Sequence, residues 1–331
     1  MKTPIRILLV GCGRMALGHA SGLESLGELG VIVAGVDPSE DARNNLKTQY
    51  GVSTTFDNLD HALASVEADA AIIAVPNFLH RDYTIACLER GLHTLIEKPM
   101  ALTLADVDDM IATAEAKGKL LMSGQSQRFS TAIRQVKKLL EENAVGKIRH
   151  VIHRRLGSGR GGDENSWFAR QELSGGILPG IGVHSLDVLL WWMDEKAVSV
   201  SAIVQNIDPH PDIDIEDEVS LIATTESNAI LNCALSFHHH AGTEWTVMGD
   251  EGVIHLNGTS GPLLLNGKEQ HIPETVHLAG EPNIHLEFLT AIRDNRPLAQ
   301  ASARDVRKTM ALIFAAMESG KTGKTTKVIR R

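Results

Sequence analysis

The sequence is poor in cysteine, and the few cysteines it has follow no pattern. Cys12, Cys87 and Cys233 are the only ones in 331 residues, an odd number without the spacing of a metal site. Scattered thiols of this kind are typical of a protein kept in a reducing compartment. We therefore expect a cytoplasmic protein.

A surplus of positive charge and a long hydrophobic run are also missing. The formal net charge is −9 at pH 7, which argues against a surface for nucleic acid or anionic lipid. No apolar run approaches the roughly 20 residues that a bilayer-spanning helix needs. The apolar run at 5–10 is short and leads into a glycine turn, so it reads as a buried strand and not as a signal peptide. We expect neither a nucleic-acid nor a membrane partner.

The first motif in the sequence is a predicted glycine turn between a strand and a helix. Residues 5–10 (IRILLV) are apolar, residues 17–27 have a helical pattern, and VGCGRMA lies between them. Gly11 permits the tight turn, and Gly13 has no side chain to block a pyrophosphate resting on the helix N-terminus. Ala16 takes the place of the third glycine, an accepted variant. The alternative interpretation is an ordinary glycine-rich turn.

An acidic residue follows at the end of the second predicted strand. Asp37 closes the apolar segment VIVAGVD, 26 positions after Gly11. A carboxylate there accepts hydrogen bonds from an adenosine ribose and repels a 2′-phosphate, which favours NAD and leaves NADP as the second possibility.

Strand and helix patterns alternate through the first 125 residues. Residues 68–76 and 92–99 are apolar strands, each followed by a helical segment, and 119–129 contains a sixth strand. This order predicts a doubly wound parallel sheet, whose ligands bind beyond the carboxyl ends of the strands. The groups at those ends are Gly11–Gly13, Asp37, Pro76–Asn77, Glu97–Lys98 and Gln125.

The pattern changes after a helix predicted at 130–142. Residues 147–157 have strand character, 158–167 form a polar, glycine-rich loop, and alternating runs fill 196–278. The fold class is therefore α/β, with an N-terminal Rossmann domain at 1–125 and a C-terminal α/β domain at 126–331. The second domain carries a large, mostly antiparallel open sheet, whose free face suits a homodimer or homotetramer. The last helices, 283–297 and 302–321, are candidates to pack back on the first domain.

A second chemical cluster lies at 174–194. A run of glycines and a proline precedes a helix that begins near Val183 and carries His184 and Asp187 on one face. A histidine at a helix start beside a glycine loop suits a general acid–base group. A histidine packed in the core with Asp187 as its partner is the alternative.

Together these motifs resemble the Gfo/Idh/MocA family, the glucose–fructose oxidoreductase and inositol dehydrogenase group. The resemblance covers nearly the whole chain and rests on GCGRMA, VDP, AVPNFLH, EKPMALT, QRF and GGILPGIGVHSLD. It implies hydride transfer between a nicotinamide and a secondary carbinol of a sugar, cyclitol or related compound. Lys98 of the EKP motif and His184 are then the catalytic residues.

The resemblance and the motifs together assign two sets of binding residues. The cofactor set is Gly11, Gly13, Arg14, Met15, Asp37, Pro76, Asn77, His80, Glu97, Lys98 and Gln125. The substrate set is Lys98, Arg128, Arg155, Trp167, Gly180 and His184. Arg155 could meet a carboxylate or phosphate of the substrate or form a structural salt bridge, and Trp167 could stack on a sugar or pack in the core.

One position departs from the family pattern. The family often has an aspartate four residues before the histidine, and here that residue is Gly180. Three functions therefore stay open: a sugar dehydrogenase, a hydrolase or lyase that oxidises a sugar carbon transiently with NAD, and a non-catalytic NAD-binding sensor or subunit. We expect no metal, because the run His238–His240 lacks a completing carboxylate or cysteine pattern.

Overall fold

The computed structural model describes residues 3–158 and 164–330, with the backbone alone for Ser158, His239 and His240. The described chain divides into two compact units. The first unit holds residues up to 101, 105–124 and 279–305, and the second holds 102–104, 125–278 and 306–330. The polar loop expected at 158–167 lies partly outside the described residues, since 159–163 are not among them.

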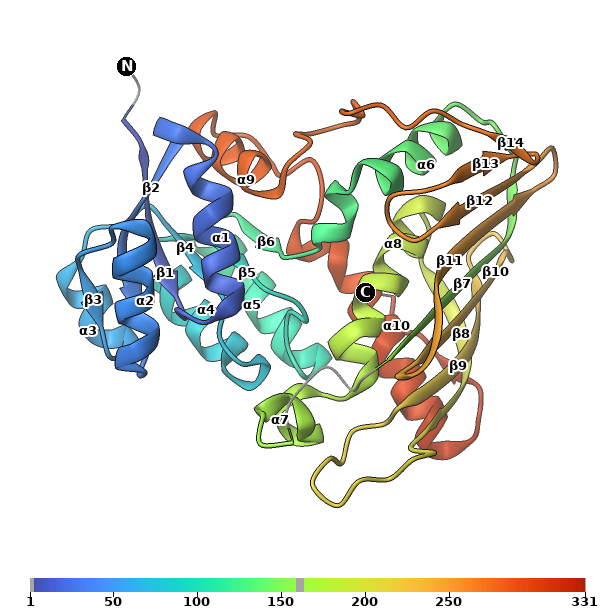
Figure 1. Ribbon diagram of the computed structural model, residues 1–331, viewed down its shortest axis with the longest axis horizontal. Helices are drawn as coiled ribbons and strands as arrows, with labels where there is room; N and C mark the ends of the chain where they lie inside the picture. The colour runs from blue at the N-terminus through green and yellow to red at the C-terminus, as the bar shows by residue number, and fades with distance from the viewer. Residues whose placement is uncertain (1–2, 159–163, 331) are drawn as a thin grey trace. The chain divides into compact units, whose positions relative to one another are not determined.

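Within the described part of the first unit, six parallel strands form one sheet in the order β3-β2-β1-β4-β5-β6 (Figure 1). The strands are β1 (Ile5–Val10), β2 (Gly30–Val36), β3 (Thr55–Phe56), β4 (Ala70–Ile73), β5 (His93–Ile96) and β6 (Leu121–Ser123). The central strand β4 is buried at every position, as expected where helices cover both faces. This is the doubly wound sheet that the alternating pattern predicts.

Helices in the first part of the chain connect these strands, and one further helix of the first unit comes from near residue 290. They are α1 (Arg14–Glu24), α2 (Glu40–Tyr50), α3 (Leu59–Ser65), α4 (His80–Glu89), α5 (Leu104–Ala116) and α9 (Ile284–Arg293). The helix after the glycine turn begins at Arg14, three residues earlier than the pattern suggests, because Gly13 already caps it. Helix α9 packs on α1.

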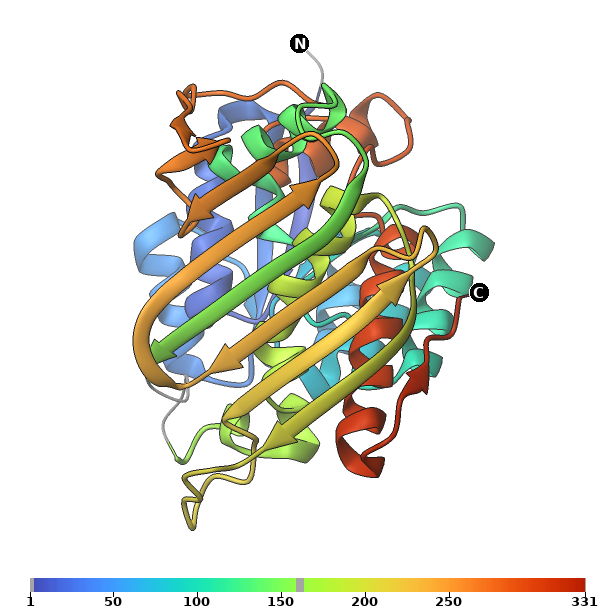
Figure 2. The same cartoon turned by 90° about the vertical axis from the view of Figure 1, so that its right-hand side faces the viewer.

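The second unit is built on a sheet with the order β14-β13-β12-β11-β7-β10-β9-β8-β15, seen face-on in Figure 2. Its strands are β7 (Ile148–Ser158), β8 (Ala197–Gln205), β9 (Glu218–Thr225), β10 (Ile230–Ser236), β11 (His238–Gly249), β12 (Val253–Asn257), β13 (Leu263–Leu265), β14 (Lys268–Glu269) and β15 (Thr326–Lys327). Strands β7 and β10 pair in parallel, and the other pairings are antiparallel. The expectation of a mostly antiparallel sheet is confirmed.

One face of this sheet carries the helices of the unit. These are α6 (Thr131–Glu141), α7 (Gln171–Ser174), α8 (Val183–Met193) and most of α10 (Ala303–Thr322). Strand β9 shows why one face is covered, since Val219, Leu221 and Ala223 are buried while Ser220 and Ile222 are exposed.

The segment Gln171–Met193 has the length and hydropathy of a membrane-spanning helix, and 83% of its most apolar stretch is buried inside the fold. It runs through α7, a π-helical turn at Leu178–Gly182 and α8. Its apolar side chains are therefore core residues of the second unit.

Candidate functional site

The two glycines of the turn after β1 serve different purposes. Gly11 has φ +92°, and a Cβ there would lie 2.3 Å from the carbonyl oxygen of Ala74. Gly13 has an ordinary φ of −76°, and a Cβ there would meet no described atom within 4 Å. Packing within the protein therefore requires Gly11, whereas Gly13 leaves open space where a ligand can approach the backbone.

The N-terminus of α1 faces that space without a side-chain cap. Gly13 is the capping residue, no side chain bonds to the first turn among the described residues, and that turn contains no acidic residue. Arg14 and Met15 are exposed there. Uncapped N–H groups and the positive end of the helix dipole favour a phosphate.

Asp37 links the end of β2 to this turn. One carboxylate oxygen accepts the N–H of Cys12 at 2.8 Å, and the other accepts the N–H of Ser39 at 2.8 Å. Arg43 holds the same segment by donating to the Asp37 carbonyl at 2.6 Å. The carboxylate is only half-buried, and each oxygen keeps a further lone pair for a ribose hydroxyl.

His80 has a different place from the one expected. Its ring is fully buried, Nδ1 lies 2.6 Å from the carbonyl oxygen of Pro99, and Nε2 lies 3.0 Å from that of Val75. Burial lowers the pKa of His80. Both ring nitrogens are thus engaged with backbone, so His80 joins the segments after β4 and β5 and offers no atom to a cofactor. Asn77, by contrast, is buried at the start of the following turn, and it stays a predicted cofactor residue together with Pro76.

Glu97, just before Lys98, belongs to a buried chain of polar groups in the first unit. Its Oε1 lies 3.0 Å from Nε2 of His19, and Nδ1 of His19 lies 2.8 Å from Nε2 of His285. Its Oε2 accepts the backbone N–H of Lys98 at 3.1 Å. Burial raises the pKa of Glu97, but the bond from His19 and the adjacent charges outweigh it and lower the pKa to about 2.

The carboxylate of Glu97 is therefore ionised and held on both sides by protein groups. This favours a positioning role for Glu97 over direct contact with the cofactor. It fixes the backbone of Lys98 at the carboxyl end of β5, where a parallel sheet binds its ligands. The Lys98–Pro99 peptide bond is cis.

His285 can contact His19 because the residue of α1 that faces its ring, Gly22, has no side chain. A Cβ at Gly22 would lie 2.3–2.5 Å from the His285 ring. Burial and the neighbouring His19 lower the pKa of His285 to about 4. Its Nδ1 has no hydrogen-bond partner among the described residues.

Gln125 is the last expected cofactor residue along the chain. It is 1% exposed, and neither its amide oxygen nor its amide nitrogen has a partner in the described chain. A buried amide left unsatisfied costs about 1–3 kcal/mol for each group. Such an amide is suited to a ligand that both donates and accepts hydrogen bonds.

These features fit a dinucleotide. The N–H groups at the start of α1 would hold its pyrophosphate, and Asp37 its adenosine ribose. The open space at Gly13 is the observation that supports this fit. Gln125, whose amide is unsatisfied, belongs to the second unit and stays a predicted cofactor residue.

In the second unit, His184 is the second residue of α8, directly after the π-helical turn. Its Nδ1 is shielded from solvent, while the residue as a whole is half-buried. The next residue, Ser185, contacts Nε2 of His153 on β7 at 2.8 Å. The inner face of the sheet therefore anchors the start of α8 and with it His184.

Arg128 is not available to a substrate, and that expectation is wrong. It is fully buried, and its guanidinium donates twice to Asp187, each time at 2.6 Å. Asp187 also accepts from Thr309 at 3.0 Å. Arg128 and Asp187 thus form a buried pair that ties the turn before α6 to α8 and α10.

The missing aspartate at position 180 has a structural counterpart. A Cβ at Gly180 would lie 2.8 Å from the tip of the Phe168 ring. Phe168 also contacts Trp167 edge to face, with ring centroids 5.8 Å apart. An aromatic ring therefore occupies the space beside Gly180 where a side chain would begin, and Trp167 stays a predicted substrate residue.

Arg154 and Arg155 point to opposite faces of β7. Arg154 forms an exposed ion pair with Glu244 on β11. Arg155 is half-buried, and its Nη1 has neither solvent contact nor a partner among the described residues. The structural salt bridge considered for Arg155 is thus made by its neighbour.

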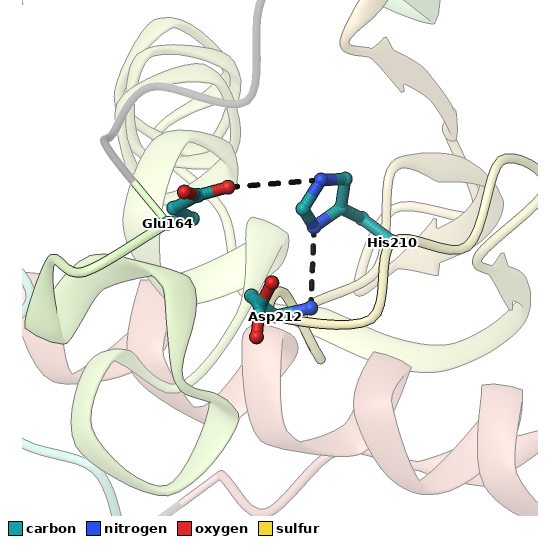
Figure 3. A group of neighbouring side chains, drawn as sticks. All are labelled: Glu164, His210 and Asp212. Carbon is teal, nitrogen blue, oxygen red and sulfur yellow. Dashed lines mark hydrogen bonds and ion pairs between the residues drawn. The ribbon is translucent and has the colours of Figure 1, made fainter.

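Among the described residues, one group of three side chains brings possible metal ligands together: Glu164, His210 and Asp212 (Figure 3). All three are exposed, and Nδ1 of His210 already accepts the backbone N–H of Asp212 at 3.2 Å. Exposed groups of this kind do not define a metal site. In the run at 238–240, His238 pairs with Asp217 at 2.8 Å, and the side chains of His239 and His240 lie outside the described residues.

The sheet order, the glycine turn and the held carboxylate define a dinucleotide-binding Rossmann unit, joined in one chain to an α/β unit with a histidine at a helix start. Comparison with known proteins identifies it further. Residues 5–125 match the family model described as "Oxidoreductase family, NAD-binding Rossmann fold", and residues 133–255 match the "GFO/IDH/MocA C-terminal domain". The chain belongs to the Gfo/Idh/MocA family of NAD-binding oxidoreductases, which confirms the resemblance seen in its motifs.

Individual relatives differ in what their names say they act on. The chain is 28% identical over 250 residues to 2,7-anhydro-N-acetylneuraminate hydratase of Mediterraneibacter gnavus, an alignment covering 72% of this chain and 64% of that protein. It is 31% identical over 206 residues to D-glucoside 3-dehydrogenase of Escherichia coli, covering 61% and 58%. The aligned parts thus span less than two thirds of both relatives.

Among solved structures, the WlbA dehydrogenase from Bordetella pertussis has the same fold. The TM-score is 0.88 at 22% identity, and the match covers 99% of this chain and 100% of that one.

Sequence reasoning missed three side chains that support the candidate site: His19, Phe168 and His285. Each meets its partner only through folding, so no local spacing marks it. The sequence offered one signal for these residues: a histidine on the apolar face of the helix after the glycine turn. That signal identifies His19 but neither Phe168 nor His285.

Proposed function

We propose that this chain transfers a hydride between NAD and a secondary carbinol of a sugar, cyclitol or sugar derivative, with Lys98 and His184 as its catalytic residues. The observation that carries the proposal is the held position of Lys98. Glu97, ionised and anchored by His19, fixes the Lys98 backbone at the ligand-binding end of β5. The name of the E. coli relative, a glucoside dehydrogenase, supports the reaction class.

The chemistry divides between these side chains. NAD, when bound, supplies the hydride acceptor. His184 takes the hydroxyl proton, and we assign this step to Nε2 because Nδ1 is shielded. The Lys98 ammonium donates a hydrogen bond to the same oxygen and stabilises the negative charge that develops on it. Lys98 also helps to hold the reacting groups in register.

The test replaces each catalytic residue and measures turnover and cofactor binding separately. His184→Ala and Lys98→Ala are each expected to lose about 10²–10⁴-fold in kcat, because each removes a group that acts in the transition state. NAD affinity should stay within a few fold. His255→Ala and Lys268→Ala, which change exposed residues of the same types, serve as controls. Near-normal turnover in either catalytic variant would remove that residue from the mechanism.

A second candidate function is a lyase or hydrolase that oxidises a sugar carbon only transiently. The name of the M. gnavus relative, a hydratase, favours keeping it. Such an enzyme would convert substrate without net NADH production and would retain its cofactor through purification. Absorbance at the NADH band during turnover, together with the cofactor content of the purified protein, separates the two functions.

A non-catalytic NAD-binding role is the third candidate, and Gly180 is the reason to test it. If Phe168 replaces the family aspartate by shaping the site, Phe168→Ala should lower kcat/KM. If the aspartate has been lost with function, only Gly180→Asp combined with Phe168→Ala should create turnover. The double variant is needed because a Cβ at position 180 meets the Phe168 ring.

We also propose a homodimer or homotetramer formed through the second sheet. The face of β8, β9 and β10 that carries no helix exposes Ile203, Ile222 and Ile230 at 61%, 54% and 40%. Apolar side chains gathered on one open sheet face are typical of a surface that another molecule covers.

For location we propose the cytoplasm. All three cysteines are buried and free, and burial raises the pKa of each thiol to about 12. The denatured protein, handled without reductant, should titrate three free thiols.

A further inference from the structure

Arg155 is a half-buried cation for which the described chain provides no anion. It lies on the inner face of β7, the face that α8 covers, and its Nη1 is out of contact with solvent and has no hydrogen-bond acceptor among the described residues. Arg154, one residue away, faces the other side and pairs with Glu244. The charge of Arg154 is thus balanced by a carboxylate at the surface, whereas the charge of Arg155 on the inner face is balanced by none that the structure describes.

The two titratable side chains that interact electrostatically with Arg155 are neutral. Cys233, on the adjacent strand, is fully buried, and its thiol stays protonated because burial raises its pKa to about 12. Burial lowers the pKa of His153, two residues along the same face, to about 3, so that ring is uncharged at neutral pH. Burial also lowers the pKa of Arg155 itself, yet a guanidinium keeps its charge in a protein.

Two buried or half-buried carboxylates of the second unit are already engaged elsewhere. Asp187 is held by Arg128 and Thr309. Glu216 accepts from Gln171 at 3.1 Å and from the backbone N–H of Ile177 at 3.3 Å. Neither forms an ion pair with Arg155, and the turn Leu178–Gly182 contains no acidic residue.

Arg155 lies on the part of the sheet that faces the start of α8, the helix that carries His184. Its partner in the β10 ladder is Leu235, and a Cβ at Gly182 would lie 2.9 Å from a methyl group of Leu235. His153, about 7 Å along the same face of the strand, contacts Ser185. Gly182 and Ser185, on either side of His184, therefore face the stretch of β7 and β10 that carries Arg155.

We propose that Arg155 binds an anionic group of the substrate, a carboxylate or a phosphate, so that the substrate of this enzyme is an anionic sugar derivative. This rests on the proposed function, since it places the anion on the molecule that His184 deprotonates. A planar guanidinium binds a carboxylate or phosphate through two parallel hydrogen bonds. Such a ligand satisfies the buried Nη1 and balances the buried charge in one step.

The experiment compares three compounds with one ring and different groups at C6: D-glucose, D-glucuronate and D-glucose 6-phosphate. Thermal unfolding of the full chain with NAD is measured with each compound at low salt. At least one of the two anions should raise the Tm, and glucose at the same concentration should not. Which anion acts distinguishes a carboxylate site from a phosphate site. Arg155→Met should abolish the shift, and Arg154→Met should keep it.

Two further readouts separate this inference from the proposed reaction. Without ligand, Arg155→Met should unfold no more readily than the wild type, because it removes an uncompensated buried charge. In turnover, Arg155→Gln should lower kcat/KM for the anionic sugar about 10–100-fold, with kcat changed less. Equal responses to glucose and both anions, no response to either anion, or a marked loss of stability in Arg155→Met would overturn the proposal. Loss of turnover with an intact anion-dependent Tm shift would overturn the reaction and leave the anion site standing.

Discussion

At the residue scale, Gly11 and Gly13 are two positions apart in one motif, but glycine is needed at each for a different reason. Gly11 is required by the fold, through a positive φ and a backbone oxygen where its side chain would be. Gly13 is required by nothing in the described protein. Its absence of a side chain matters only when a ligand lies against it.

The two glycines therefore predict different losses. Gly11→Ala should lower the free energy of unfolding by about 2–4 kcal/mol, because it adds backbone strain to steric overlap. Gly13→Ala should leave that free energy nearly unchanged and weaken NAD binding at least tenfold. Urea unfolding and calorimetric titration with NAD measure the two effects. Normal NAD affinity in Gly13→Ala would contradict the pyrophosphate assignment.

Asp37 sets the second prediction at this scale. Asp37→Ser removes the carboxylate that excludes a 2′-phosphate, so the ratio of NAD to NADP affinity should fall by about ten- to a hundredfold. Asp41→Ser, an equal change in charge at an exposed position in the first turn of α2, should leave the ratio unchanged. Tighter binding of NADP than of NAD by the wild type would overturn the cofactor preference.

At the scale of single elements, α1 combines three tasks. Its N-terminus meets the cofactor turn, His19 on its inner face bonds to Glu97, and Gly22 one turn later leaves room for the ring of His285 on α9. Loss of the last contact should disturb the second, because the His285 ring supports His19.

Two alanine substitutions on α1 test this dependence. Gly22→Ala should destabilise the protein by about 1–3 kcal/mol, because the new methyl overlaps a buried ring. Its kcat should also fall as the support of Glu97 and Lys98 loosens. Gly18→Ala, where a Cβ meets no described atom within 4 Å, should stabilise by up to about 1 kcal/mol through helix propensity. Equal effects of the two on stability would show that His285 does not depend on Gly22.

At the scale of the whole molecule, each unit contains a buried histidine held neutral. Burial lowers the pKa of His153 to about 3 and that of His285 to about 4. The unfolded chain protonates both near pH 6.5, so below that pH the unfolded state binds more protons than the folded state. Stability is then lost as pH falls.

Between pH 6.5 and 5 each histidine should therefore cost about 2 kcal/mol of stability. His153→Gln and His285→Gln are each expected to be less stable than the wild type at pH 7.5 but to lose less on acidification. His255→Gln, an exposed change, should keep the wild-type pH dependence. Chemical unfolding at pH 7.5, 6.5 and 5.5 measures the slopes, and parallel slopes for all variants would contradict the assignment.

The open face of the second sheet gives the other prediction at this scale. Ile222→Glu places a charge at the centre of the exposed isoleucines on β8–β10, so the oligomer should dissociate at least tenfold more readily. Ile329→Glu alters an isoleucine of similar exposure, 55%, outside those strands and should not. Sedimentation velocity over a range of concentrations decides, and a wild-type monomer at high concentration would end the proposal.

Most of the fold could be predicted from local sequence patterns. The strand at 5–10 lies where the sequence predicts it, and strands β8–β13 lie within the alternating runs at 196–278. Burial on one or both faces of a strand leaves a direct pattern in the residue order. The glycine turn at Gly11 and Gly13 is also visible locally, because both positions depend on the absence of a side chain.

Pairings between distant residues were not visible. Arg128 was assigned to the substrate because it follows a strand end, but it is buried against Asp187, 59 residues away. Glu97 was predicted to bind the cofactor, but one of its carboxylate oxygens is hydrogen-bonded to His19. A charged side chain near the rim of a sheet can serve ligand or fold equally well, and only its partner in space decides which.

The return of α9 to the first unit has a consequence for how the protein is made. The chain supplies β1–β6 within its first 123 residues, yet His285 and the backbone at Ala301, which accepts the N–H of Ser123 at 2.9 Å, are synthesised more than 160 residues later. Domains that are continuous in sequence can fold while the ribosome is still extending the chain. Here the NAD-binding unit cannot complete its row of buried polar groups until His285 and Ala301 have been translated. A nascent chain stopped at residue 278 should therefore bind NAD poorly, even though it carries every residue of the cofactor turn.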